Sequence, residues 1–149
     1  MTLTLTAAEQ VLADNFAPWV LDLGLTVESV GAPGSPGSPG SDDGHEAVLR
    51  LPWSDRLARE GGGLSGQALM AAADTATVIA VAAARGGFVP MTTVQQSISF
   101  QRAVTGADVL VRARLTKSGR RMAFADITMT ADGTRETAAH ATAVYALLG

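Results

Sequence analysis

The sequence predicts an α+β domain in which one curved antiparallel sheet wraps around one central buried helix, with a short helix near the N-terminus. The central helix is expected over residues 64–84, where the side chains are apolar nearly all round. Four strands are expected after it, because apolar and polar residues alternate there between short turns. These strands span residues 91–104, 107–117, 121–131 and 135–147. The chain is long enough for a single domain, 1–149, with its own core.

The N-terminal third adds a short helix and a hairpin. Residues 7–16 are expected to be helical, with Thr6 as the N-cap and Glu9 completing a capping box. Residues 31–44 contain five glycines and three prolines, which predicts a flexible loop without apolar anchors. The strands on either side of this loop are expected over residues 19–30 and 45–53.

Composition excludes several functional classes. The chain has no cysteine, which excludes thiol nucleophiles, zinc–thiolate sites and disulfides. Its two histidines, His45 and His140, lie in no ligand-type spacing, so we expect no metal and no cofactor. The first residues lack the basic start of a secretory signal, and no uncharged apolar run reaches 18 residues. We therefore expect a cytoplasmic protein with no membrane partner.

Charge and hydrophobicity indicate the kind of partner. Residues 1–49 contain seven acids and no Lys or Arg, whereas residues 50–149 contain eleven bases and seven acids. Bases are scattered and aromatic residues make up only 5%, which disfavours nucleic acid but leaves a site for one small anionic ligand open. The apolar content of 47% is high for a small monomer, so we expect a homo-oligomer.

Asp74 is the first candidate for a functional residue. On a helix its neighbours are Met70, Ala71, Thr77 and Val78, so its carboxylate lies among mostly apolar side chains. Such a carboxylate is costly unless it is hydrogen-bonded or faces a pocket. One interpretation is a structural carboxylate bonded to a backbone amide or an arginine; the other is a desolvated general base or nucleophile.

The start of the same helix is the second candidate. Unpaired amides at a helix N-terminus bind anions and developing oxyanions, and Gly66 would let a ligand approach the backbone closely. The alternative is that Ser65 is an ordinary N-cap. An oxyanion site and a base on one helix, Gly66 and Asp74, would suit acyl transfer.

A turn with three cations is the third candidate. Lys117, Arg120 and Arg121 flank Gly119 at an expected hairpin tip, where exposed charge is ordinary. The same cations would also suit the phosphates of a nucleotide-like carrier.

Three segments together resemble a known family. They are residues 63–76 (GLSGQALMAAADTA), 92–100 (TTVQQSISF) and 117–124 (KSGRRMAF). In these segments the chain is similar to the hotdog-fold acyl-CoA thioesterases of the phenylacetate-degradation (PaaI-like) type. The similarity spans roughly residues 45–149, and the spacing within the Ala-Asp-Thr-Ala stretch at Asp74 is its most specific part.

The resemblance implies roles for individual residues. Asp74 takes the position of the family's base or nucleophile, and Gly66 that of the amide that polarises the thioester carbonyl. Ser65 replaces the family's usual His, Gln67 its second glycine, and Arg59 an Asn or Gln. In that family the sites lie at dimer interfaces, and dimers of dimers are common. The positions that correspond to CoA-binding or accessory residues are Arg59, Thr93, Phe100, Gln101, Arg102, Lys117, Gly119, Arg120 and Arg121.

The resulting hypothesis is a homo-oligomeric hotdog thioesterase, a dimer or dimer of dimers, that hydrolyses an acyl-CoA. Asp74 would activate water or attack the carbonyl, and the Gly66 amide, with Ser65, would stabilise the oxyanion. Two alternatives remain: a non-catalytic hotdog protein that binds acyl-CoA, and a hotdog hydratase. A hydratase is expected to pair an Asp with a His near the site, and neither His45 nor His140 is well placed for this.

Overall fold

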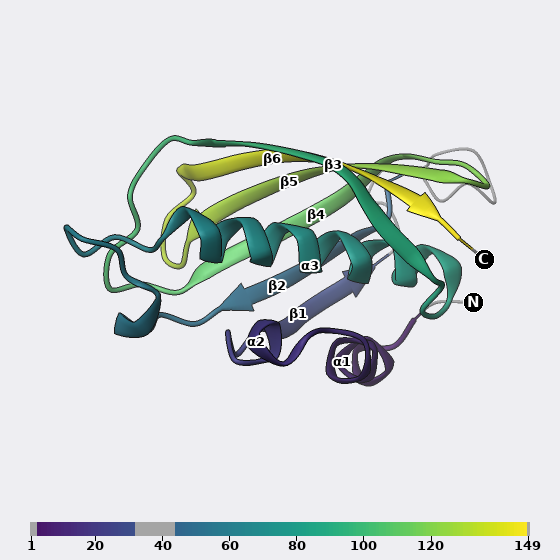
Figure 1. Ribbon diagram of the computed structural model, residues 1–149, viewed down its shortest axis with the longest axis horizontal. Helices are drawn as coiled ribbons and strands as arrows, with labels where there is room; N and C mark the ends of the chain where they lie inside the picture. The colour runs from purple at the N-terminus through teal and green to yellow at the C-terminus, as the bar shows by residue number, and fades with distance from the viewer. Residues whose placement is uncertain (1–2, 32–43, 149) are drawn as a thin grey trace.

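One six-stranded antiparallel sheet wraps around one long helix in the computed structural model, which describes residues 3–31 and 44–148 (Figure 1). The strands run in the order β1-β2-β4-β5-β6-β3. The α+β prediction is therefore confirmed. The strands are β1 (Thr26–Gly31), β2 (Glu46–Leu51), β3 (Met91–Phe100), β4 (Val109–Ser118), β5 (Met122–Ala131) and β6 (Thr137–Leu147). The helices are α1 (Leu5–Asp14), α2 (Pro18–Leu21) and α3 (Gly66–Arg85), with a 3-10 turn at Asp55–Leu57.

The core lies between α3 and the sheet face that curves around it. Along β4 the inward residues Val109, Val111, Ala113 and Leu115 are fully buried, which confirms the predicted alternation. Helix α3 is long and apolar enough to cross a membrane by length and composition, but 72% of its apolar 18-residue stretch is buried inside the protein. It is therefore the core helix of this fold, as its all-round apolar pattern predicts.

The ends of α3 are set by local hydrogen bonds. Ser65 is its N-cap, with Oγ accepting from the Ala68 amide at 3.2 Å. Gly86 ends the helix in the left-handed conformation (φ 77°), and its amide donates to the Ala82 carbonyl. Inside the helix, the Thr77 hydroxyl donates to the Ala73 carbonyl at 2.9 Å, which satisfies a buried polar group locally.

The N-terminal helix begins earlier than predicted. Thr4, not Thr6, is the N-cap, and its Oγ1 accepts from the Ala7 amide at 3.0 Å. Leu3 and Ala8 on either side of this cap are both buried in the core, which favours the earlier start. Glu9 forms no capping box; its Oε1 accepts from the Val27 amide at 2.9 Å and links α1 to β1.

Part of the predicted first strand is helical. Pro18 occupies the first turn of α2, where its fixed φ suits a helix, and Gly24 (φ 74°) then reverses the chain before β1 begins at Thr26. The prediction of a strand from residue 19 is therefore wrong for residues 19–25. Most of the predicted loop, residues 32–43, lies outside the described residues.

Strand β3 ends at Phe100 rather than at residue 104. The Gln101 and Arg102 amides both donate to the Ala138 carbonyl, at 2.8 and 3.0 Å, so the chain turns away from a regular ladder there.

A charged cluster links β1 and β2 to the residues that flank β4 and β5. Arg50 on β2 pairs with Glu28 on β1, with Asp108 Oδ2 at 3.0 Å and with Asp132 Oδ2 at 2.8 Å. Asp108 Oδ1 also accepts from the Trp53 amide at 2.7 Å. The Trp53 amide and then the Arg50 guanidinium hold the pKa of Asp108 below its ordinary value.

We expect Asp108→Asn to lower the melting temperature near neutral pH. Asn keeps an acceptor for the Trp53 amide but loses the charge that Arg50 faces. A depressed folded-state pKa contributes stability above the unfolded pKa, about 3.9, and loses it as pH falls through the folded value. The difference in melting temperature between wild type and Asp108→Asn should therefore become smaller below about pH 4. Thermal denaturation at both pH values measures this, with exposed Asp126→Asn as control. If this difference in melting temperature is the same at low pH, the destabilisation comes from altered packing and not from the lost charge.

Candidate active site

The Asp74 carboxylate lies on α3 opposite two neighbouring strands. Thr93 on β3 donates its hydroxyl to Asp74 Oδ1 at 2.8 Å, and Tyr145 on β6 donates to the same oxygen. Asp74 is half-buried, whereas Tyr145 is only 2% exposed. The carboxylate is thus hydrogen-bonded by two hydroxyls, not by the backbone amide or arginine that a structural role suggested.

A cavity of about 360 Å³ adjoins this carboxylate. Asp74 is the only acidic or basic side chain among the residues that line it. Gln96 donates Nε2 to the Met70 carbonyl at 3.0 Å, and its Oε1 is buried with no partner within the described part of the chain. This oxygen can accept a hydrogen bond from a bound water or a substrate amide. The lining residues are Trp19, Gln67, Met70, Ala71, Asp74, Thr93 and Gln96.

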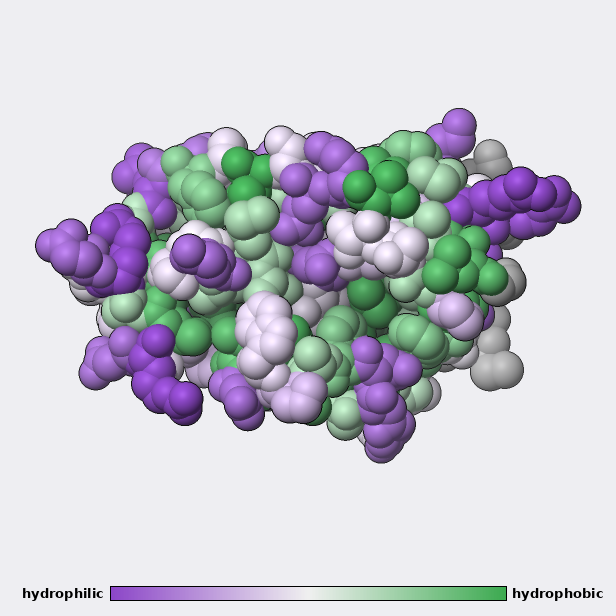
Figure 2. All heavy atoms as spheres, viewed as in Figure 1, coloured by the Kyte–Doolittle hydropathy of each residue, from purple (hydrophilic) through white to green (hydrophobic). Residues whose placement is uncertain are grey.

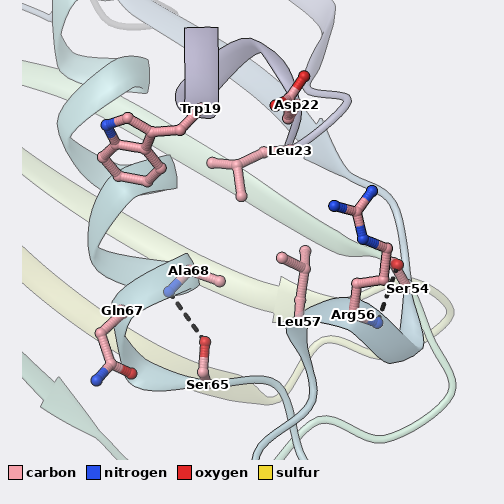
Figure 3. A pocket seen from close by; sticks show the side chains of 9 residues that line it. All are labelled: Trp19, Asp22, Leu23, Ser54, Arg56, Leu57, Ser65, Gln67 and Ala68. Carbon is pink, nitrogen blue, oxygen red and sulfur yellow. Dashed lines mark hydrogen bonds between the residues drawn. The ribbon is translucent and has the colours of Figure 1, made fainter. Parts of the chain in front are cut away.

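A second cavity of about 310 Å³ lies at the N-terminus of α3 (Figure 3). Trp19 and Gln67 line both cavities, so the two lie on either side of these residues. Figure 3 shows Ser65 bonded to the Ala68 amide, with Leu57 and Arg56 on the far side from Gln67. The lining residues are Trp19, Asp22, Leu23, Ser54, Arg56, Leu57, Ser65, Gln67 and Ala68.

The Gly66 amide is a free donor at the positive end of α3. Between residues 44 and 148, and within 3–31, no hydrogen bond uses this amide. The Ser65 amide, by contrast, donates to the Leu57 carbonyl at 2.8 Å. A Cβ added at Gly66 would lie 3.1 Å from Phe100 Cζ, so the aromatic ring rests against the glycine backbone. Gly66 is therefore an amide that this helix end leaves available to a ligand.

One protomer does not bring Gly66 and Asp74 to the same substrate carbonyl. They are eight positions apart on a continuous helix, which is about 12 Å at 1.5 Å per residue. The sequence predicts that Gly66 and Asp74 combine into one site, because both lie on the same helix. Within a single chain, however, that helix holds them apart.

The other predicted binding residues fall into separate places. Thr93 lies at Asp74 and Phe100 at Gly66. The Arg59 guanidinium donates to its neighbour's carbonyl, that of Glu60, at 2.8 Å. Gln101 donates to the Ser99 hydroxyl at 3.3 Å, and Arg102 pairs with Glu136 at 3.1 Å, both on the surface.

The cationic turn lies at the opposite end of α3 from Gly66 (Figure 1). Arg85, the last residue of α3, donates to the Gly119 carbonyl at 2.6 Å. Lys117, Arg120 and Arg121 in this turn are exposed. Within one chain they do not share a cavity with Asp74.

Tyr145 is the site residue that sequence analysis missed. It is the chain's single tyrosine and lies at an inward position of the predicted strand 135–147. Burial, followed by the nearby Asp74 charge, raises the pKa of its hydroxyl well above the ordinary value. The sequence did contain a signal for Tyr145, because a tyrosine at a core position of a strand buries a hydroxyl that needs a hydrogen-bond partner.

Comparisons with known proteins agree with this fold. The family model of the thioesterase superfamily matches residues 61–138, more than half of the chain. Zebrafish thioesterase superfamily member 2 is 25% identical over 99% of this chain and 100% of its own, with a TM-score of 0.79. A variant of the Thermus thermophilus phenylacetic acid degradation protein PaaI is 26% identical over 89% and 100%, with a TM-score of 0.70. The E. coli PaaI protein is 18% identical over 97% and 96%, with a TM-score of 0.76. No curated protein sequence matches the chain significantly.

The fold and the matches define the class of protein as a hotdog-fold thioester hydrolase. The chain belongs to the thioesterase superfamily, and its predicted resemblance to the phenylacetate-degradation type is confirmed.

Proposed function

We propose that this protein hydrolyses the thioester of an acyl- or aryl-acyl-CoA to the free acid and CoA. The observation that carries the proposal is the Asp74 carboxylate, which Thr93 and Tyr145 hold beside a cavity whose other lining side chains are neither acidic nor basic. Membership of the thioesterase superfamily supports the reaction class. No cofactor is needed, because a carboxylate and an amide donor suffice for acyl transfer to water.

The proposed chemistry assigns one task to each group. The Gly66 amide donates to the thioester oxygen as it becomes negative. The Asp74 carboxylate then either takes a proton from water, which attacks the carbonyl carbon, or attacks that carbon itself. In both cases the C–S bond breaks and CoA leaves as the thiolate. Direct attack gives a mixed anhydride, which water cleaves to the acid and the free carboxylate.

We propose further that two copies complete each site. The 12 Å between Gly66 and Asp74 calls for the amide of one protomer and the carboxylate of its partner. Strand β3 supports such an interface, because it is a sheet edge that pairs only with β6 among the strands that the structure describes. Val94 and Phe100 on this strand are 56% and 52% exposed. Figure 2 shows apolar and weakly polar side chains across the middle of the α3 face, interrupted by a few hydrophilic groups.

A panel of short, long and aromatic acyl-CoAs tests the proposed function. Release of free CoA, followed with a thiol reagent, is expected for at least one acyl class, and Asp74→Asn is expected to lower its rate by about 10²- to 10⁴-fold. Tight binding without release across the whole panel would favour a non-catalytic acyl-CoA-binding protein instead.

We expect Arg120→Ala and Arg121→Ala to raise KM for acyl-CoA while kcat stays close to wild type. Contacts to the carrier's phosphates do not change at the reacting carbonyl, so they contribute to binding only. The control substrate is an N-acetylcysteamine thioester, which lacks the nucleotide phosphates. An equal loss with both substrates would show that these arginines do not bind the CoA phosphates.

A further inference from the structure

We infer that Tyr145 is a positioning residue for Asp74: with Thr93 it occupies one carboxylate oxygen and leaves the other to react. This inference rests on the proposed function of Asp74. The two hydroxyls come from directly paired positions, because Thr93 and Tyr145 are register partners across β3 and β6. Paired residues on adjacent strands point to the same face, which explains why both reach one atom.

The two oxygens of Asp74 have different surroundings. Oδ1 accepts from both hydroxyls, whereas no described residue donates to Oδ2. The Tyr145 hydroxyl also lies 2.9 Å from the Asp74 carbonyl, but its single proton favours the charged oxygen. Oδ2 is therefore the oxygen left to take a proton from water or to attack the carbonyl carbon.

A β-bulge in β3 places Thr93 and Gln96 on the same face of the strand, the face that lines the cavity. The register with β6 shifts between Thr93 and Gln95, so Gln96 pairs with the inward-facing Ala143. Thr93 and Gln96 then both face the cavity, although regular alternation would place them on opposite faces. Thr93 thus bonds Asp74 while Gln96 lines the space in front of it.

Tyr145 is a permanent donor in this position. Its raised pKa keeps the hydroxyl protonated through the neutral and alkaline range, so it does not compete with Asp74 as a base. The groups that face Asp74 are Trp19 from α2, Gln67 and Met70 from α3, Thr93 and Gln96 from β3, and Tyr145 from β6. Apart from Tyr145 none of them titrates, so an acid limb in the rate reports on the carboxylate itself.

The test is Tyr145→Phe, which keeps the ring and removes only the hydroxyl. We expect kcat to fall by about 10- to 100-fold with KM within about twofold, as for an interaction that acts on the reacting group. The acid limb of kcat/KM should move to higher pH by about one unit, because a charged carboxylate loses one of its donors. The matched control is Thr142→Val, which removes an exposed hydroxyl from the same strand and should leave both quantities unchanged.

A second pair of variants covers the case in which Tyr145→Phe does not fold. Thr93→Val removes the other donor at an exposed strand position and should shift the acid limb in the same direction. Thr93→Ser keeps a hydroxyl and should restore the wild-type profile. Unchanged acid limbs in every folded variant among Tyr145→Phe and Thr93→Val would overturn the inference.

The outcomes also separate this inference from the proposed function. If Asp74→Asn abolishes turnover while Tyr145→Phe matches wild type in rate and pH profile, the inference fails and the function stands. If wild type hydrolyses no acyl-CoA, the function fails. The ¹³C signal of the Asp74 carboxyl, followed against pH, then tests the inference without turnover. A signal that titrates alike in wild type and Tyr145→Phe would reject it.

Discussion

Asp74→Asn is expected to fold and assemble normally while losing about 10²- to 10⁴-fold in kcat. The amide can keep an acceptor oxygen where Thr93 and Tyr145 donate, so the surrounding strands have no reason to move. It can neither take a proton from water nor attack a thioester. Steady-state hydrolysis of the best acyl-CoA in the panel measures the loss, and size-exclusion chromatography confirms the assembly.

Asp126→Asn is the matched control for this variant, because it removes the same charge from an exposed position on β5. It should retain wild-type kcat. Activity of Asp74→Asn within a few-fold of wild type, with the assembly intact, would remove Asp74 from the proposed mechanism.

Gly66→Pro is expected to lose about 10²- to 10³-fold in kcat beyond any loss in Gly66→Ala. Both variants add a Cβ that meets Phe100 Cζ, but only proline removes the amide hydrogen. Proline suits the first position of a helix, and Ser65 before it already has the extended backbone (φ −66°, ψ 147°) that proline requires. The comparison therefore isolates the N–H donor, and equal rates in the two variants would exclude it as the oxyanion donor.

Mixing the two inactive variants shows whether the site is shared between protomers. If Gly66 of one chain works with Asp74 of its partner, a mixed dimer of Asp74→Asn and Gly66→Pro has one intact site and one doubly altered site. Random reassortment then restores about a quarter of wild-type activity. If each site uses one chain only, every site in the mixture carries a defect and no activity returns.

Periodicity was sufficient to predict α3 and the sheet, because both bury a continuous set of side chains. Val109, Val111 and Leu115 alternate along β4, and α3 lacks a polar face. The distance between Gly66 and Asp74 could also have been predicted from the sequence, because it follows from their eight-position spacing on one helix. By contrast, the start of α1 depends on the burial of Leu3 against the core, which no local pattern shows.

The contacts of Asp74 could not be predicted from the pattern alone. Thr93 and Tyr145 are 52 residues apart (145 − 93), and they meet only because β3 pairs with β6 in one register. The bulge that sets this register has no glycine or proline to mark it, since residues 93–96 read Thr-Val-Gln-Gln. Long-range pairing of this kind depends on the whole sheet.

The bulge in β3 also affects how the cavity beside Asp74 can change. Because β3 has a partner on one side only, inserting or deleting one residue there disturbs a single ladder and leaves the core between α3 and β4 intact. Such a change would exchange the side chain at Gln96 for one from the opposite face, while Thr93 and Asp74 stay in place. The lining of the cavity beside Asp74 can therefore change through length changes in an edge strand, separately from the hydrogen bonds that hold the carboxylate.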